Sequence, residues 1–242
     1  MTNWHISETH GKYRLKVSTT DQVFNFEISD DKVGITLSGG IDSAVFLQTI
    51  AQFLSDTGQN HVSVIPFHGM ENLRPDTVGS VQSICDYTHS HYPDLNLQDL
   101  VVFPVYSEIV YSKKKKGLDE QGKVPQMNAF YDLYELPEII MAMNCLPEKH
   151  ILDEWGCNYY SIDRLRRDRD VYEVFDNFRY YKPIVNCDKR MTKALFDYLE
   201  LDDELLEMTS SCTGFPSETE YYTKPCGKCY HCQEKKWAFG KL

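Results

Sequence analysis

The sequence lacks a hydrophobic run long enough to cross a membrane. Its first residues, MTNWHISETHGKYRLK, also lack the apolar stretch of a secretion signal. Basic residues are too few for the positive face that nucleic-acid binding requires, because 25 Lys and Arg stand against 36 Asp and Glu, a formal net charge of −11. We therefore expect a protein of the cytoplasm (the host cytoplasm if the chain is viral) that acts on a small molecule, with no membrane partner and with nucleic acid disfavoured.

Size and composition exclude a disordered chain and two equal domains. The 242 residues, 42% of them hydrophobic and 13% aromatic, are enough to bury one sizeable core. We expect a β-hairpin in residues 1–32, a main α/β domain in residues 33–205 and a C-terminal extension in residues 206–242.

Alternating strand and helix patterns predict an α/β fold. Apolar residues alternate with polar ones over 13–17 and again over 24–28, around the turn TTDQ, as in a hairpin. Short apolar runs at 33–37, 62–67 and 100–106 read as strands, and helical spacing follows the first two, over 44–58 and 75–91. This order predicts a parallel sheet with helices on both faces.

The second half of the chain gives weaker patterns. We expect a helix from Pro125 that Pro137 kinks or restarts, a helix with Val171, Phe175 and Phe178 on one face, and an edge strand in 182–187. Thr192 is the expected N-cap of a helix over 192–201. The charged runs at 113–116 and 164–170 are expected to be solvated surface.

The most informative segment is Leu37-Ser38-Gly39-Gly40-Ile41-Asp42-Ser43, between a predicted strand and a predicted helix. A helix N-terminus offers several N–H groups and a positive dipole end to phosphate oxygens, and the glycines let the backbone approach the ligand closely. Asp42 has the wrong sign for bare phosphate, which indicates a role on magnesium or on an ordered water. No lysine follows the glycines, so the pattern is not a Walker A loop. A plain serine-glycine turn is the alternative.

Cysteine, with eight residues, is abundant for a cytosolic chain. Cys85, Cys145, Cys157 and Cys187 lie apart, and we expect them to be small buried side chains. Cys226, Cys229 and Cys232 follow one another at two-residue gaps, and Cys212 completes a set of four, which predicts a structural Zn²⁺ site. An iron–sulfur cluster is the rival interpretation.

Two of these motifs together resemble a known family. SGGIDS resembles the loop of the PP-loop ATP pyrophosphatases, the adenine nucleotide alpha hydrolase group. Its combination with KRMTKALFDYLEL, LLEMTSSC and PCGKCYHCQEKKWAFG resembles the 7-cyano-7-deazaguanine synthases of queuosine biosynthesis. The resemblance covers about a third of the chain and implies a Rossmann-like sheet and a homodimer.

The resemblance also implies a reaction and a set of site residues. A substrate carboxylate, that of 7-carboxy-7-deazaguanine, attacks the α phosphate of ATP and releases pyrophosphate, and ammonia then gives an amide that a second adenylation converts into a nitrile. Asp42 and Ser43 are the implied catalytic residues, Leu37–Ser43 the implied ATP and Mg²⁺ site, and Asn128 a substrate contact. His68 follows the second strand at the edge where such sheets bind ligands, and is either a nucleotide contact or an ordinary surface histidine. Arg190 and Lys193 could approach the phosphates, but we expect their side chains to be exposed to solvent at the end of a helix.

The middle of the chain departs from the family pattern. Met127 stands where that family has an arginine beside the asparagine, and the usual aspartate–cysteine–arginine run is not recognisable around 155–169. A different acceptor, either another carboxylate or a tRNA base that is thiolated, therefore remains an alternative. A nucleotide-binding protein without turnover is a third interpretation.

Overall fold

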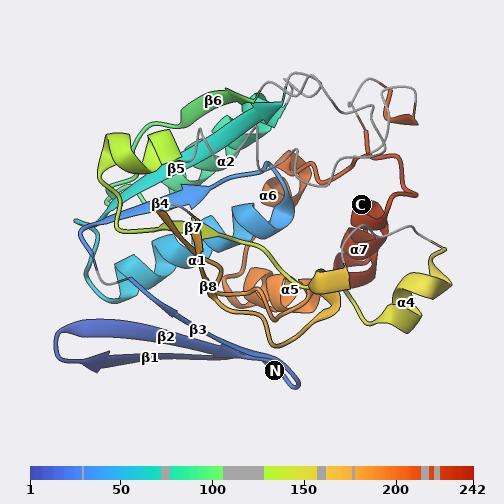
Figure 1. Cartoon of the computed structure of the whole chain (residues 1–242), viewed down its shortest axis with the longest axis horizontal. Helices are drawn as coiled ribbons and strands as arrows, with labels where there is room; N and C mark the ends of the chain where they lie inside the picture. Colours follow the sequence, from blue (N-terminus) through green and yellow to red (C-terminus); the bar gives the residue numbers. More distant parts are fainter. Residues whose placement is uncertain are drawn as a thin grey trace.

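Two β-sheets organise the chain (Figure 1). The computed structural model describes residues 1–28, 30–71, 77–105, 128–156, 162–175, 178–213, 218–220 and 224–242. Its named elements are β1 (Asn3–Thr9), β2 (Lys12–Ser18), β3 (Val23–Glu27), β4 (Lys32–Thr36), α1 (Ile41–Asp56), β5 (Ser63–Glu71), α2 (Thr77–His91), β6 (Val101–Val105), β7 (Ile139–Met141), α4 (Lys149–Glu154), η1 (Ile162–Leu165), β8 (Tyr172–Phe175), β9 (Phe178–Tyr181), α5 (Lys189–Tyr198), α6 (Asp203–Met208) and α7 (Tyr230–Phe239).

The larger sheet confirms the predicted α/β class. Its order is β6-β5-β4-β7-β9-β8, and every pair is parallel except β8 with β9. β4, which leads into the SGGIDS loop, lies near the centre between β5 and β7. Pro104 lies in the edge strand β6, where a missing backbone donor breaks no inner ladder.

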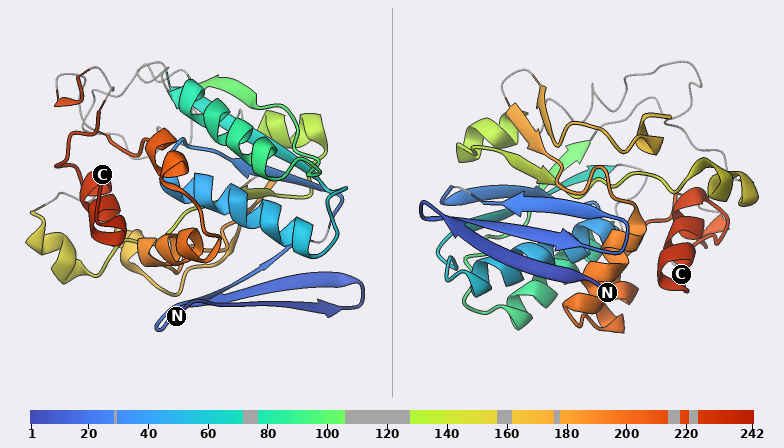
Figure 2. Two further views of the ribbon diagram at one scale, coloured as in Figure 1. Left: turned by 180° about the vertical axis from the view of Figure 1, so that it is seen from behind. Right: turned by 90° about the horizontal axis from the view of Figure 1, so that it is seen from below.

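The two faces of this sheet bury separate apolar clusters. Successive residues of a strand point to opposite faces, so Ile139 joins one cluster and Ile140 the other, and Tyr180 and Tyr181 divide in the same way. Helices α1, α2 and α5 cover one face, and the helical segment 128–134 packs on the other through Phe130, which stacks on Phe67 at 4.7 Å (Figure 2).

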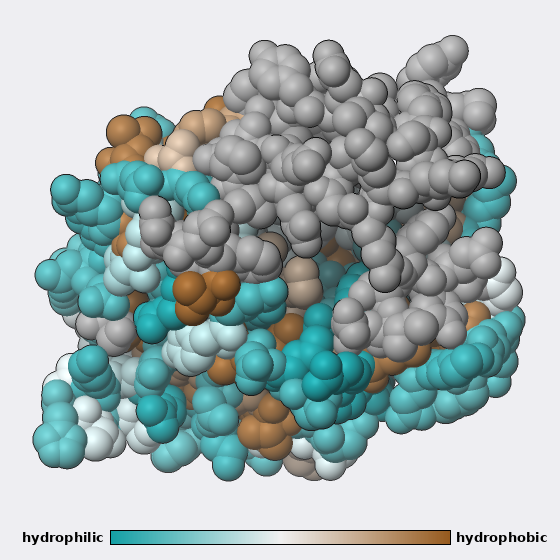
Figure 3. Space-filling view, in the orientation of Figure 1, coloured by the Kyte–Doolittle hydropathy of each residue, from teal (hydrophilic) through white to brown (hydrophobic). Residues whose placement is uncertain are grey.

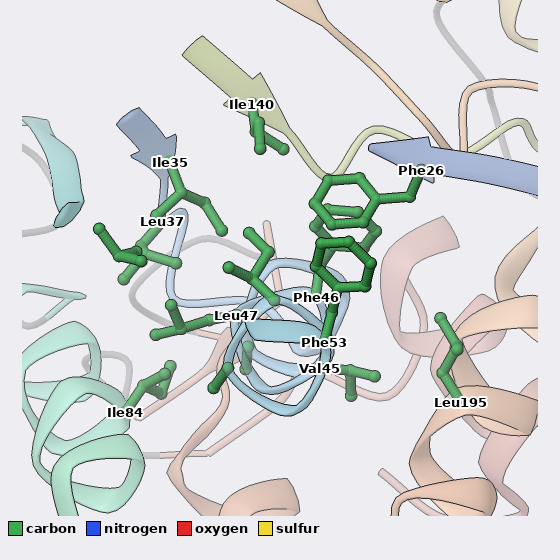
Figure 4. Packing of buried hydrophobic residues seen from close by; sticks show 14 of the residues in the cluster. Phe26, Ile35, Leu37, Val45, Phe46, Leu47, Phe53, Ile84, Ile140 and Leu195 are labelled. Atoms are coloured by element: carbon green, nitrogen blue, oxygen red, sulfur yellow. The ribbon is translucent and has the colours of Figure 1, made fainter. Parts of the chain in front are cut away.

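Helix α1 is the centre of the core. It is apolar almost all round and buries twelve of its residues, as expected for a helix enclosed by other elements (Figure 4). The N-terminal sheet closes one side, because Phe26 of β3 meets Phe46 and Phe53 edge-on, each at 5.4 Å between ring centroids. The predicted hairpin is present as β2 and β3, and β1, which was not predicted, adds a third antiparallel strand.

Several expectations for the second half of the chain are wrong. After Pro137 the chain forms the strand β7 instead of resuming a helix, and the residues around Val171 form β8 and β9. These strands have only three or four residues each, which is too short for a period-two pattern to stand out. The segment 182–187 is a turn, not an edge strand. Asp188, not Thr192, caps α5, because its carboxylate accepts a hydrogen bond from the Arg190 N–H.

None of the helices in the described part of the chain is long and apolar enough to span a bilayer. The face in Figure 3 is mainly hydrophilic over the described residues, with apolar groups in separate small patches. Exposed apolar side chains that occur singly, such as Leu133, are normal on a protein surface.

Candidate functional site

The SGGIDS loop joins the carboxyl end of β4 to α1 and depends on both glycines. Gly39 has a φ of +79°, a left-handed conformation that is strained for any other residue. Gly40 has an ordinary φ of −87°, but a Cβ on it would lie 2.8 Å from Ser211 Oγ. The backbone thus turns sharply at one glycine and packs closely at the next.

Serine hydroxyls hold the loop from within. Ser43 Oγ donates to the Gly40 carbonyl at 3.0 Å and accepts from the Ser38 N–H at 3.2 Å. Ser38 Oγ lies 3.2 Å from Ser43 Oγ and accepts from the Gly40 N–H at 3.3 Å. These short-range bonds fix the loop before any ligand binds.

The N-terminus of α1 opens directly from this loop. Gly40 is the N-cap residue and has no side chain, so no side-chain cap occupies the first N–H groups of the helix. These donors and the positive end of the helix dipole are features that can receive an anion. The predicted strand–loop–helix arrangement is present, and its role in phosphate binding stays a prediction.

Asp42, in the first turn of α1, is held by three side chains from later parts of the chain. Its Oδ1 accepts hydrogen bonds from Thr192 Oγ1 at 2.7 Å and from Asn144 Nδ2 at 3.0 Å. Its Oδ2 accepts from Lys189 Nζ at 2.7 Å. The Asp42 side chain is 20% exposed, so it keeps access to the pocket described below.

Lys189 is fully buried between two carboxylates. Besides Asp42, its Nζ lies 3.2 Å from Oε2 of Glu234, on α7. Burial alone lowers the pKa of Lys189, but the charges of Asp42 and Glu234 outweigh burial and raise that pKa above its usual value. Lys189 is therefore a permanent cation beside the loop.

Arg164, on η1, supports the opposite side of Asp42. Its Nη2 donates to both the backbone oxygen and the Oδ1 of Asn144, at 3.2 and 3.0 Å, and this orients the amide toward Asp42. A further bond of 3.5 Å joins its Nη1 to the Tyr230 hydroxyl. The expectation that the whole arginine-rich run is solvated surface is thus wrong for Arg164, because the buried backbone around Asn144 needs hydrogen-bond donors.

An open pocket of about 220 Å³ lies against these groups. It brings together the hydroxyls of the loop, one carboxylate and one guanidinium, so it can receive both phosphate and an anionic acceptor. Its lining residues are Thr36, Ser38, Asp42, Ser43, Met141, Ala142, Met143, Asn144 and Arg164.

His68 lies behind the loop and is not an ordinary surface histidine, because only 3% of it is exposed. Its Nδ1 lies 2.7 Å from the Leu37 carbonyl oxygen and its Nε2 lies 3.0 Å from Thr77 Oγ1. A carbonyl oxygen can only accept, so Nδ1 carries a proton. His68 therefore fixes the residue before the loop and ties it to the start of α2.

Asn128 begins the helical segment 128–134, and its Oδ1 is buried without a hydrogen-bond partner among the described residues. It is not one of the described residues that line the pocket beside Asp42. Met127 lies outside the described residues.

The C-terminal cysteines form the second candidate site. The Sγ atoms of Cys212, Cys226, Cys229 and Cys232 all lie within 4.8 Å of one another, and these four thiols can hold a metal. Backbone N–H groups already support two of them, because Cys226 N donates to Cys212 Sγ and Cys229 N donates to Cys226 Sγ, at 3.2 and 3.3 Å. A hydrogen bond from Cys232 lowers the pKa of the Cys229 thiol, and the same bond raises the pKa of Cys232, so these two thiols share one proton.

His231 lies beside this cluster but outside the set of four thiols. Burial, with Lys189 and Arg164 nearby, lowers its pKa to about 4, so it is neutral at pH 7. Of the scattered cysteines, Cys85, Cys145 and Cys187 are buried as expected, and Cys157 lies outside the described residues.

Sequence reasoning missed Lys189, Thr192, Asn144, Arg164 and Glu234. A signal was present for Lys189, since cations are unfavourable in the first turn of a helix unless a carboxylate pairs with them. Another was present for Asn144, a polar residue inside an apolar stretch. The cations considered before, Arg190 and Lys193, instead pair with Asp188 and Asp197.

Comparisons with known proteins add little to this picture. No protein-family model and no curated protein matches the sequence. Among solved structures, the chain is similar to the "U34-tRNA thiolase NcsA from Methanococcus maripaludis with its [4Fe-4S] cluster", at 16% identity and a TM-score of 0.43. The match covers 86% of this chain and 70% of that one. Values of this size assign neither a reaction nor a substrate to the chain.

Proposed function

We propose that this chain is an ATP-dependent enzyme that splits ATP between its α and β phosphates. The observation that carries the proposal is Asp42, fixed by three hydrogen bonds at the start of α1 and facing a pocket lined by Ser38 and Ser43. A carboxylate held against a glycine-rich anion loop suits a magnesium nucleotide better than a free anion.

The residues of the loop take separate roles in this reaction. The first N–H groups of α1 and the hydroxyls of Ser38 and Ser43 hold the pyrophosphate end of ATP. Lys189 contributes a positive charge behind Asp42, where negative charge accumulates as pyrophosphate leaves. Bound Mg²⁺ neutralises phosphate charge, and Asp42 is its proposed ligand. His68 holds the backbone at Leu37 rather than the nucleotide itself.

The proposed acceptor is a carboxylate, that of 7-carboxy-7-deazaguanine. A carboxylate oxygen attacks the α phosphorus, the bond to the bridging oxygen breaks, and pyrophosphate leaves. Ammonia then attacks the acyl carbon and displaces AMP, and a second adenylation of the amide oxygen allows loss of AMP and a proton to give the nitrile. Arg164 supports this choice, because its guanidinium lines the same pocket and suits a carboxylate.

Thiolation of a tRNA base keeps the same ATP step and changes the acceptor. The cysteine cluster favours this second candidate only if it holds iron and sulfur. We propose Zn²⁺ instead, because four thiolates at about 2.3 Å from one ion lie about 3.8 Å apart, in keeping with sulfurs that all lie within 4.8 Å. The net charge of −11 also favours a small acceptor.

The proposal is tested by incubating the protein with Mg²⁺, ATP, ammonium and 7-carboxy-7-deazaguanine, while AMP, pyrophosphate and product mass are followed together. AMP with the nitrile mass supports the full reaction, and an accumulating amide limits the activity to its first half. AMP formed only with tRNA and a sulfur donor moves the function to thiolation. Absence of AMP with every acceptor, in a protein that binds ATP, would leave a nucleotide-binding protein without turnover.

A further inference from the structure

Glu234 is a buried carboxylate that the proposed reaction does not use. It lies on α7, is 1% exposed, and neither of its oxygens has a hydrogen bond from the described residues. Its one ion pair among them is with Lys189, whose Nζ lies 3.2 Å from Oε2. A charge buried in this way is unfavourable unless other groups compensate for it. Replacement of a whole buried ion pair by apolar residues is often neutral or stabilising, so stability alone does not explain the pair of Glu234 with Lys189.

Lys189 is shared between Glu234 and Asp42. The contact with Asp42 Oδ2 is the shorter, at 2.7 Å against 3.2 Å. Two further charged groups act on this pair, Arg164 from η1 and Lys235 from α7. Arg164 donates hydrogen bonds to Asn144 and to the neutral hydroxyl of Tyr230. Glu234 is the group that can keep Lys189 paired if Asp42 turns away.

A metal bound by Asp42 would compete with Lys189 for the same carboxylate. The Asp42 oxygens accept three hydrogen bonds, which leaves one lone pair on Oδ2, and a Mg²⁺ ion bound there would lie close to the ammonium of Lys189. Repulsion between the two positive charges favours movement of the ammonium away from Asp42. Without a second carboxylate, that step would leave an unpaired cation in a fully buried position, which is strongly unfavourable.

We propose that Glu234 is a positioning residue that retains Lys189 when Asp42 passes from the lysine to Mg²⁺. This inference rests on the proposed function, since it requires a magnesium nucleotide at the loop. Glu234 touches neither nucleotide nor metal in this scheme, and it acts only through Lys189. Its expected effect is on the Mg²⁺ requirement of nucleotide binding and not on nucleotide affinity at saturating Mg²⁺.

The test uses calorimetry to measure the binding of α,β-methylene ATP at increasing Mg²⁺ concentrations. This analogue cannot be split between its α and β phosphates. In Glu234→Gln the half-saturating Mg²⁺ concentration should rise roughly tenfold, the equivalent of one weakened charge-assisted contact. Glu234→Asp keeps the charge and should show a much smaller rise. Glu204→Gln makes the same change at an exposed position of α6 and should match the wild type.

The outcomes separate this inference from the proposed function. A wild-type protein that binds no magnesium nucleotide overturns both. Binding by the wild type, with the same Mg²⁺ dependence in Glu234→Gln, overturns only the role of Glu234. Metal content of the cysteine site and the melting temperature are measured for each variant, and if Glu234→Gln does not fold, the partial shift expected of Glu234→Asp decides the question.

Discussion

Lys189 Nζ lies 2.7 Å from Asp42 Oδ2, although 147 residues separate them in the chain. The pair joins the first turn of α5 to the first turn of α1, beside the glycine loop. Because both residues are held by further partners, the position of Asp42 is a property of the whole fold and not of the loop alone.

Replacement of Asp42 should abolish the proposed reaction and leave the fold intact. We expect Asp42→Ala to reduce AMP formation by about 10²–10³-fold, as for the loss of one preorganised group that stabilises charge in the transition state. The measurement is the initial rate of AMP release at saturating ATP. Asp56→Asn, at the exposed far end of α1, is the matched control and should keep wild-type activity. Equal rates in Asp42→Ala and the wild type would contradict the role of Asp42.

Removal of the Lys189 charge should destabilise the protein strongly. Lys189→Met leaves the buried carboxylate of Glu234 without its ion pair and removes one of the three hydrogen bonds to Asp42, and we expect a loss of about 3 kcal/mol in the free energy of unfolding. Urea unfolding measures this loss. Lys193→Met, which breaks only an exposed i,i+4 pair on the same helix, should cost about 0.5 kcal/mol or less.

The same measurement on a double variant tests whether Glu234 and Lys189 interact. Since Lys189→Met/Glu234→Leu removes both members of a buried pair, it should be more stable than Lys189→Met alone. Additive losses in the double variant would show that the contact of 3.2 Å contributes nothing measurable.

Replacement by alanine should have opposite effects on stability at Gly39 and at Gly79. Gly39→Ala forces a Cβ into a left-handed conformation and should cost about 1–2 kcal/mol, with weaker nucleotide binding. Gly79→Ala should instead stabilise the protein by about 0.5–1 kcal/mol, since Gly79 lies in α2 with open space around it. Thermal unfolding of both variants, with nucleotide-binding affinity, distinguishes strain at the loop from a general effect of alanine.

After a chelator removes the metal, the clustered cysteines should react with an alkylating reagent and the scattered ones should not. Metal analysis of the protein as purified is expected to give one zinc per chain. After the metal is removed at pH 8, an alkylating reagent should label Cys226 and Cys229, which are only partly buried. Burial raises the pKa of the Cys85 thiol to about 12, so this residue stays a protonated thiol and should remain unlabelled until the protein unfolds. Labelling of Cys85 in the native protein would show that α2 opens readily.

Helices and strands with a regular apolar pattern could be predicted from the sequence. So could candidate sites whose residues are close together in the chain. The loop from Leu37 to Ser43 and the cysteine cluster fall in this class, because local spacing alone brings most of their ligands together. Strands β7, β8 and β9 were missed, since they have only three or four residues each, too few to show a period. Lys189 and Glu234 were missed for another reason, namely that long-range pairing has no local pattern.

The residues that hold Asp42 lie far apart in the sequence, so they are synthesised at different times. Asn144, Arg164, Lys189 and Thr192 emerge during synthesis long after the loop, and Glu234 comes later still. Until α7 is complete, Lys189 has one carboxylate instead of two, and Asp42 alone balances its charge. The charge balance beside the glycine loop is therefore completed only when the last helix of the chain has docked.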